Sequence, residues 1–197
     1  MSTRDYWLAA VSSSLTIALN YTYATVIGQL LVPYGNTQVE FLGILVNLFG
    51  IVGAAILAVT ISKTGLRFLR ADQAITCCTL VALVLFWIFE ENETACYFTV
   101  ALLGFVNIPI YFTAYELAVE QSCSDGVLGE ATPCGVINML GNGLASVEIF
   151  ALTPILSRGD VWGVNVTIGI MMGVQILACG MIALVRMPKQ TEDSHRS

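Results

Sequence analysis

Six stretches of this chain are apolar over lengths that match the hydrocarbon core of a lipid bilayer. A membrane-spanning helix needs about 20 mostly apolar residues, whereas the strands of a membrane barrel are only about ten residues long and alternate in polarity. The stretches run over residues 7–32, 41–61, 75–89, 96–119, 135–156 and 161–185. The predicted fold class is therefore all-α membrane, a six-transmembrane-helix bundle within residues 1–187 followed by a polar cytoplasmic tail at 188–197.

Composition and motifs exclude several other functions. Only 11% of the residues are charged, against about 25% in soluble domains, and the eight lysines and arginines form no long run. We therefore expect no nucleic-acid partner. The sequence contains no GxSxG, HExxH or P-loop lysine motif, so we predict that the chain is not an enzyme. The six cysteines form no CxxC pair and His195 is the only histidine, which predicts no metal site, no cofactor and cysteines that act as small buried hydrophobes.

The basic residues predict the orientation of the bundle. With six spans, both termini share one side with the second and fourth connections. Only Arg158 falls on the opposite side. The other seven basic residues fall on the side of the termini: Arg4, Lys63, Arg67, Arg70, Arg186, Lys189 and Arg196. Positive residues favour the cytoplasm, so both termini and the basic loop with Lys63, Arg67 and Arg70 are predicted to be cytoplasmic. Asn92 begins a glycosylation sequon in the third connection, on the outer side. The plasma membrane is favoured over an organelle.

Three carboxylates fall inside or at the end of predicted spans. Glu116 and Glu120 lie one helical turn apart near the end of the fourth span, and Glu148 lies in the fifth. Charged groups inside a membrane are costly and mark partners or pathways. Two interpretations of the Glu116 and Glu120 pair remain open: a structural latch to the basic loop, or a site for a proton or another cation.

Polar residues at the middle of the first and fifth spans are the candidate substrate contacts. Asn20 and Tyr21 lie at the centre of the first span, while Asn138 and Asn142 are four residues apart and share one face of the fifth. Aromatic faces attract quaternary ammonium ions. Hydrogen bonding between helices is the alternative role for each asparagine. In the fourth span, Pro109 is expected to kink the helix and free a carbonyl.

Two segments resemble the feline leukaemia virus subgroup C receptor-related transporters of the major facilitator superfamily. The first segment carries the resemblance at Tyr115, Glu116, Ala118, Glu120, Glu130, Ala131, Thr132, Gly135, Val136, Ile137 and Asn138. The second is the run from Ala18 to Val32, which contains Tyr21 and Gln29. The resemblance covers most of the chain and implies the C-terminal six-helix half of a twelve-helix transporter.

The resemblance also implies a substrate and residue roles. The family is associated with transport of choline and ethanolamine and with export or import of haem. It implies that Tyr21 helps to form an aromatic cage around the choline ammonium and that Asn142 stands at the position of a substrate-contacting glutamine. Asn142 is one methylene shorter than that glutamine, and Thr60 stands where the family has an aspartate, so both positions depart from the family pattern.

The functional prediction is a transporter half for a small organic cation such as choline or ethanolamine, or for haem. Substrate sites of this superfamily lie between two six-helix halves. The expected partners are therefore the lipid bilayer, a small-molecule substrate, and either an N-terminal six-helix half or a second copy. A different amine or an organic anion is a further option, although the spans contain no lysine or arginine to favour an anion. The alternative is a non-transporting, truncated membrane protein that acts as a regulator or receptor-like partner.

Overall fold

The structure is a computed structural model that describes residues 3–35, 39–122 and 131–185, and within these residues it is helical with no strand. The elements are α1 (Thr3–Leu31), the short 3-10 helix η1 (Val32–Tyr34), α2 (Val39–Thr64), α3 (Phe68–Phe89), α4 (Glu93–Asn107), α5 (Pro109–Ser122), α6 (Ala131–Leu156) and α7 (Val161–Ala183). With α4 and α5 counted as one span, six helices are long and apolar enough to cross a membrane. This confirms the all-α membrane bundle.

Some sequence predictions fall outside the described residues. They are the tail at 188–197 with its His195, the loop residues Cys123 and Glu130, and the basic residues Arg186, Lys189 and Arg196.

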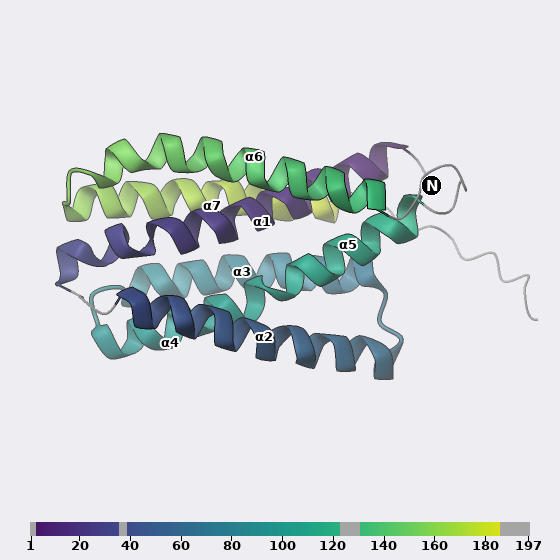
Figure 1. The fold of residues 1–197 in the computed structure, drawn as a ribbon, viewed down its shortest axis with the longest axis horizontal. Coiled ribbons are helices and arrows are strands. Elements are labelled where there is room, and N and C mark those ends of the chain that lie inside the picture. Colours follow the sequence, from purple (N-terminus) through teal and green to yellow (C-terminus); the bar gives the residue numbers. More distant parts are fainter. Residues whose placement is uncertain (1–2, 36–38, 123–130, 186–197) are drawn as a thin grey trace, which may run out of the picture.

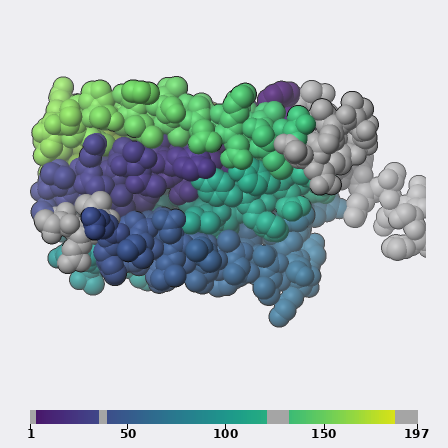
Figure 2. Space-filling model, viewed as in Figure 1, coloured from purple at the N-terminus to yellow at the C-terminus, as the bar shows by residue number. Residues whose placement is uncertain are grey.

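The helices form two groups that are joined through α3 and α5 (Figure 1). In one group α1 packs on α6 and α7, and in the other α2 packs on α4, while α3 contacts α4, α5 and α7. Helix α1 is the most buried of the six spans and α2 the least. On the face shown in Figure 2, α1 nevertheless reaches the surface between α6 and α2. A central helix that is still accessible along one face is well placed to contribute to a binding site.

The third span is longer than the sequence predicts. The apolar run begins near residue 75, yet α3 begins at Phe68 because the polar residues of its first turns are satisfied inside the bundle. The side-chain amide of Gln73 donates to the carbonyl of Ile182 at 3.1 Å. Asp72 is buried against hydroxyl groups of two other helices. A span predicted from hydropathy ends at such polar residues, because hydropathy does not include their hydrogen-bond partners in other helices.

The predicted interruption of the fourth span is present, and it shapes the contact with α2. Helix α4 ends at Asn107 and α5 begins at Pro109. Proline has no N–H, so the carbonyl of Phe105 loses its helical partner. An added Cβ at Gly53 of α2 would overlap that carbonyl oxygen. Glycine at this position therefore lets α2 approach the freed carbonyl closely.

The five described cysteines range from the core to the outer surface, with Cys134 and Cys179 partly exposed. Cys96 is fully buried in the main hydrophobic cluster, as predicted. The prediction is wrong for Cys77 and Cys78, whose side chains are exposed on α3. Both lie on a span, so the exposed faces of these small apolar side chains suit contact with lipid.

Candidate functional site

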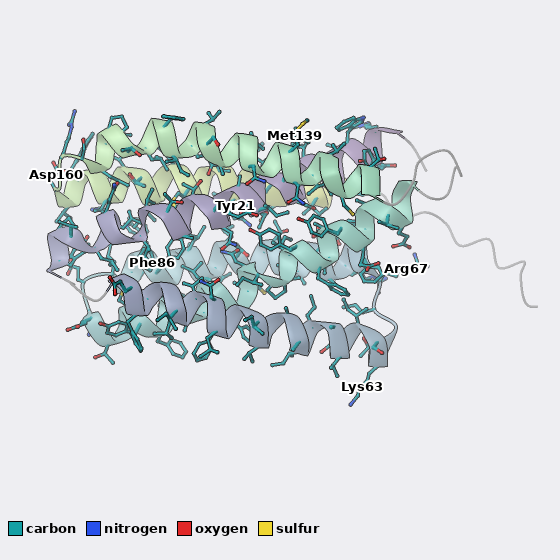
Figure 3. All side chains as sticks on the ribbon, in the orientation of Figure 1. Tyr21, Lys63, Arg67, Phe86, Met139 and Asp160 are labelled. Atoms are coloured by element: carbon teal, nitrogen blue, oxygen red, sulfur yellow. The ribbon has the colours of Figure 1, made fainter. Side chains whose placement is uncertain are left out.

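Three tyrosines from two helices form a row along the middle of the bundle. Tyr21 comes from α1, and Tyr111 and Tyr115 lie one turn apart on α5. The ring centroids of Tyr21 and Tyr111 are 5.8 Å apart at 72°, and those of Tyr111 and Tyr115 are 6.4 Å apart at 63°. These edge-to-face contacts fix the rings relative to one another. We call these three side chains the tyrosine row; each is partly exposed, and Figure 3 places Tyr21 near mid-length of the bundle.

Two asparagines anchor the tyrosine row. The side-chain amide of Asn20 donates to the hydroxyl of Tyr111 at 3.1 Å, and the hydroxyl of Tyr115 donates to the amide oxygen of Asn138 at 2.7 Å. The structure thus brings three of the four predicted substrate contacts, Asn20, Tyr21 and Asn138, to one place. The fourth, Asn142, is exposed one turn along α6 and donates to the backbone carbonyl of Asn138 at 2.8 Å. Among the described residues, Asn142 makes no hydrogen bond to the tyrosines of the row.

Glu148 supplies a carboxylate between the same helices. The hydroxyl of Thr22, next to Tyr21 in the chain, donates to Glu148 Oε2 at 2.7 Å, and the glutamate is half-buried. Helices α5 and α6 contain no lysine or arginine, and the single one in α1, Arg4, lies in its first turn. The helices around the tyrosine row therefore bring carboxylate, hydroxyl and amide groups, with no fixed positive charge near the row. Such a lining favours a cation over an anion.

A latch between the glutamate pair and the basic loop, one of the two interpretations of the pair, is not among the contacts of the described residues. Glu116 and Glu120 are exposed, and within the described residues neither makes an ion pair with the basic loop. Lys63 and Arg67 lie at one end of the bundle, opposite the end with Asp160 (Figure 3). The pair thus lies on the outside of α5, and it does not join the tyrosine row.

Two residues that the sequence analysis did not select take part in this region. Tyr111 is the middle ring of the tyrosine row, and Asp72 is a fully buried carboxyl group at the contact of α1, α3 and α5. The signal for Tyr111 was present as helical spacing, because it lies four residues before Tyr115. Asp72 had a weaker signal, as a lone acidic residue just before an apolar run.

An acidic cluster of Glu90, Glu91 and Glu93 lies beside Tyr34, at the end of the bundle that carries Asp160 (Figure 1). The hydroxyl of Tyr34 donates to Glu90 Oε1 at 2.6 Å and joins the connection after α1 to the connection before α4. Glu90 is only 6% exposed, and its Oε2 has no hydrogen-bond partner. Burial raises the pKa of Glu90 above its ordinary value, the bond from Tyr34 lowers it, and the charge of Glu91 raises it further.

Replacing Glu90 with glutamine is expected to stabilise the protein at neutral pH. Because the native state binds the Glu90 proton more tightly than the unfolded state, wild-type stability should fall as pH rises from about 4.5, the ordinary value, through the raised native pKa. Glu90→Gln removes this loss and keeps an acceptor for Tyr34. Thermal unfolding in detergent across this pH range would measure the effect. The exposed neighbour variant Glu91→Gln should change stability less, and an equal change would show that general charge, rather than burial, is responsible.

Asn92 caps the first turn of α4. Its side-chain oxygen accepts a hydrogen bond from the backbone N–H of Ala95 at 3.1 Å, and the residue is exposed. Asparagine is a favoured residue at this position because it satisfies one of the free N–H groups of the helix end. Glycosylation of Asn92 stays a prediction, and the cap gives the residue a structural role of its own.

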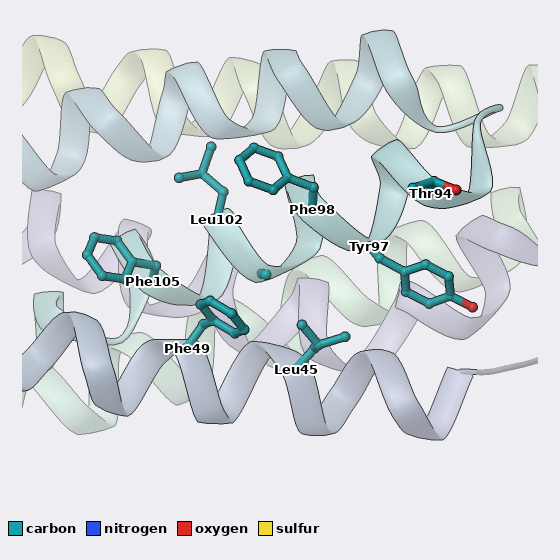
Figure 4. A pocket seen from close by; sticks show the side chains of 8 residues that line it. Leu45, Phe49, Thr94, Tyr97, Phe98, Leu102 and Phe105 are labelled. Atoms are coloured by element: carbon teal, nitrogen blue, oxygen red, sulfur yellow. The ribbon is translucent and has the colours of Figure 1, made fainter.

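An apolar groove of about 520 Å³ lies on the outside of α2 and α4 (Figure 4). Its lining includes Leu45 and Phe49 of α2 and Phe98, Leu102 and Phe105 of α4, with no charged side chain. This lining suits a lipid acyl chain better than a polar substrate. The groove shares no residue with the tyrosine row, so we do not regard it as the candidate site.

Comparison with known proteins gives no match: neither a protein-family model nor a curated protein sequence matches the chain. The function proposed for the chain is therefore based on the residues around the tyrosine row.

Proposed function

We propose that this chain is the C-terminal six-helix half of a major facilitator superfamily transporter, and that the tyrosine row contacts a small organic cation such as choline or ethanolamine. The observation that carries the proposal is the convergence of Tyr21, Tyr111 and Tyr115 with Asn20 and Asn138 where α1, α5 and α6 meet. Polar groups are costly in a membrane and tend to mark substrate pathways.

The chemistry of the row fits an ammonium ion. An aromatic face within about 6 Å of a cation contributes about 0.5–2 kcal/mol of attraction, more when the site is desolvated. Amide and hydroxyl groups can bond the hydroxyl of choline or ethanolamine. Glu148, bonded to Thr22 beside Tyr21, adds a carboxyl group whose oxygens can attract a cation. The same groups offer haem no histidine within the described residues and no positive charge for its carboxylates, so an ammonium substrate is favoured over haem.

The helix packing supports the assignment to this superfamily. If the first three spans are matched in order to the last three, the contact of α1 with α6 corresponds to that of α4 with α2. In the same way the contact of α1 with α7 corresponds to that of α4 with α3. Repeats of three helices within each six-helix half are characteristic of the major facilitator superfamily. The resemblance of residues 18–32 and 115–138 to the choline and haem transporters, drawn from their motifs, is a second argument for this proposal.

The exposed surface of α6 supports a partner across the row. Asn142 and Ser146 are exposed on this span, and the side chain of each donates a hydrogen bond to a backbone carbonyl of its own helix. Polar side chains of a membrane span normally face protein or a water-filled cavity. We infer that an N-terminal six-helix half or a second copy covers this face and completes the cavity. The proposed orientation has both termini in the cytoplasm, and the plasma membrane is the proposed location.

Uptake of labelled choline by cells that express the chain with its six-helix partner tests the proposal. Tyr21→Ala should reduce uptake by about five- to thirtyfold, because it removes a ring worth on the order of 1–2 kcal/mol, whereas Tyr21→Phe keeps the aromatic face. Surface biotinylation would show equal amounts of each variant at the membrane. Equal uptake by Tyr21→Ala and wild type would reject the role of the row. No uptake by any form, together with a strictly monomeric chain in native mass spectra, would favour the non-transporting regulator.

A further inference from the structure

Asp72 is a carboxyl group buried where α1, α3 and α5 meet. Its side chain is 0% exposed, and its two oxygens contact hydroxyl groups: Ser13 of α1 at 3.1 Å and Thr113 of α5 at 3.1 Å. Moving an isolated carboxylate out of water costs several kcal/mol even after relaxation, so a buried acid pairs with a cation or remains neutral. Asp72 is therefore expected either to pair with a cation or to carry a proton.

The helices around Asp72 provide no cationic partner. Within the described residues, Ser13 is the α1 group that meets it and Thr113 the α5 group. Helix α7 presents Gln175 and Cys179, whose side chains lie against the carbonyl of Thr76. Helix α4 presents Asn107, which accepts from Thr79 of α3. The thiol of Cys179 is the one titratable group among these neighbours, and it is not positively charged near neutral pH.

A proton on Asp72 explains the hydrogen bonds of the cluster. The hydroxyl of Thr113 lies 3.1 Å from Asp72 Oδ1 and 3.2 Å from the carbonyl oxygen of Ile110, but its single hydrogen can serve only one acceptor. If Asp72 is neutral and donates from Oδ1 to Thr113 Oγ1, Thr113 can donate to Ile110. Ser13 then donates to Asp72 Oδ2. All these polar groups are then satisfied, whereas an ionised Asp72 would be a buried negative charge held by one neutral hydroxyl on each oxygen.

We propose that Asp72 is a proton-binding site that is occupied in this conformation. The bound proton completes a chain of hydrogen bonds that joins α1, α3 and α5. Within the described residues no group of three or more histidine, cysteine, aspartate or glutamate side chains could hold a metal ion, so a proton fits the single carboxyl group of Asp72 better than a metal cation does. The site is separate from the tyrosine row, and it does not depend on what the row binds. Thr113 lies two residues after Tyr111 on α5. Loss of the proton would therefore change a hydrogen bond close to the tyrosine row.

Infrared difference spectroscopy of the purified full chain tests this site. The Asp72→Asn variant keeps the shape of a neutral carboxyl group, because its amide can donate to Thr113 and its oxygen can accept from Ser13. The spectrum of wild type minus Asp72→Asn at neutral pH should show the C=O stretching band of a protonated carboxyl group, shifted to lower frequency in D₂O. If the difference spectrum instead shows carboxylate bands alone, Asp72 is ionised and the proposal is wrong. Loss of the protonated band on addition of sodium would also overturn it.

A second variant assigns the band without relying on Asp72→Asn. Thr113→Val removes the hydroxyl that accepts from Asp72, so the C=O band of wild type should persist but move in frequency in this variant. A band that is unchanged in Thr113→Val belongs to another carboxyl group and contradicts the assignment. The measurement needs no substrate. A failure here is therefore distinct from a failure of choline transport, and either result can occur alone.

Discussion

A Gly104→Ala variant is expected to lose the close contact between α2 and α4 and to yield little folded protein. An added Cβ at Gly104 would overlap the backbone of Val46 in α2, including its carbonyl oxygen. Backbone atoms cannot rotate away as a side chain can, so the helices must separate. Overpacking of this kind costs about 1–3 kcal/mol and occasionally more. In lipid, small residues that allow close approach are a main source of helix association.

A glycine elsewhere on the same helix pair provides the control. An added Cβ at Gly43 of α2 meets no atom within 4 Å. Alanine favours a helix over glycine by about 1 kcal/mol, so Gly43→Ala should leave stability unchanged or raise it slightly. The same substitution thus has opposite expected signs at the two positions. Thermal unfolding and size-exclusion profiles in detergent would compare them. Equal stability of Gly104→Ala and Gly43→Ala would show that α2 and α4 are not packed in this way.

The same contact shows what the sequence can and cannot predict. Pro109 in an apolar span predicts an interruption and a freed carbonyl, and the structure has both features. The sequence does not say that Gly53, in a different helix, lies against that carbonyl of Phe105. Helix existence follows from local composition, because each span must satisfy its own backbone in lipid. The pairing of helices depends on side chains that are distant in sequence.

The candidate site was predicted in part for the same reason. Asn20, Tyr21 and Asn138 were identifiable, because polar residues in the middle of apolar spans stand out. Tyr111 was missed, since a tyrosine in an apolar span is compatible with simple core packing, and only the contact with Tyr21 distinguishes it. Asp72 was missed because a charged residue ends a hydropathy run. Its hydroxyl partners Ser13 and Thr113 lie 59 and 41 residues away in the chain.

Removal of the Tyr111 ring is expected to produce the largest loss of ligand affinity among single changes in the tyrosine row. Tyr111 contacts the ring of Tyr21 on one side and that of Tyr115 on the other, and it also accepts a hydrogen bond from Asn20. Tyr111→Leu should therefore remove one aromatic face and release its two neighbours. If the row binds an organic cation, a loss of about 2 kcal/mol corresponds to about 30-fold weaker binding of choline to the assembled transporter.

Two further variants separate the ring of Tyr111 from its hydroxyl and from general effects on α5. Tyr111→Phe keeps the ring and loses the bond from Asn20, so we expect a smaller loss of affinity, by less than about tenfold, consistent with about 1 kcal/mol for a hydrogen bond. Phe112→Leu removes a ring from the next position of α5, where Phe112 packs on Phe68 and not on the row. Choline affinity should be unchanged in Phe112→Leu, as measured by scintillation proximity binding. An equal loss in Phe112→Leu and Tyr111→Leu would mean that α5 itself is disturbed, and that the tyrosine row has no specific role in binding.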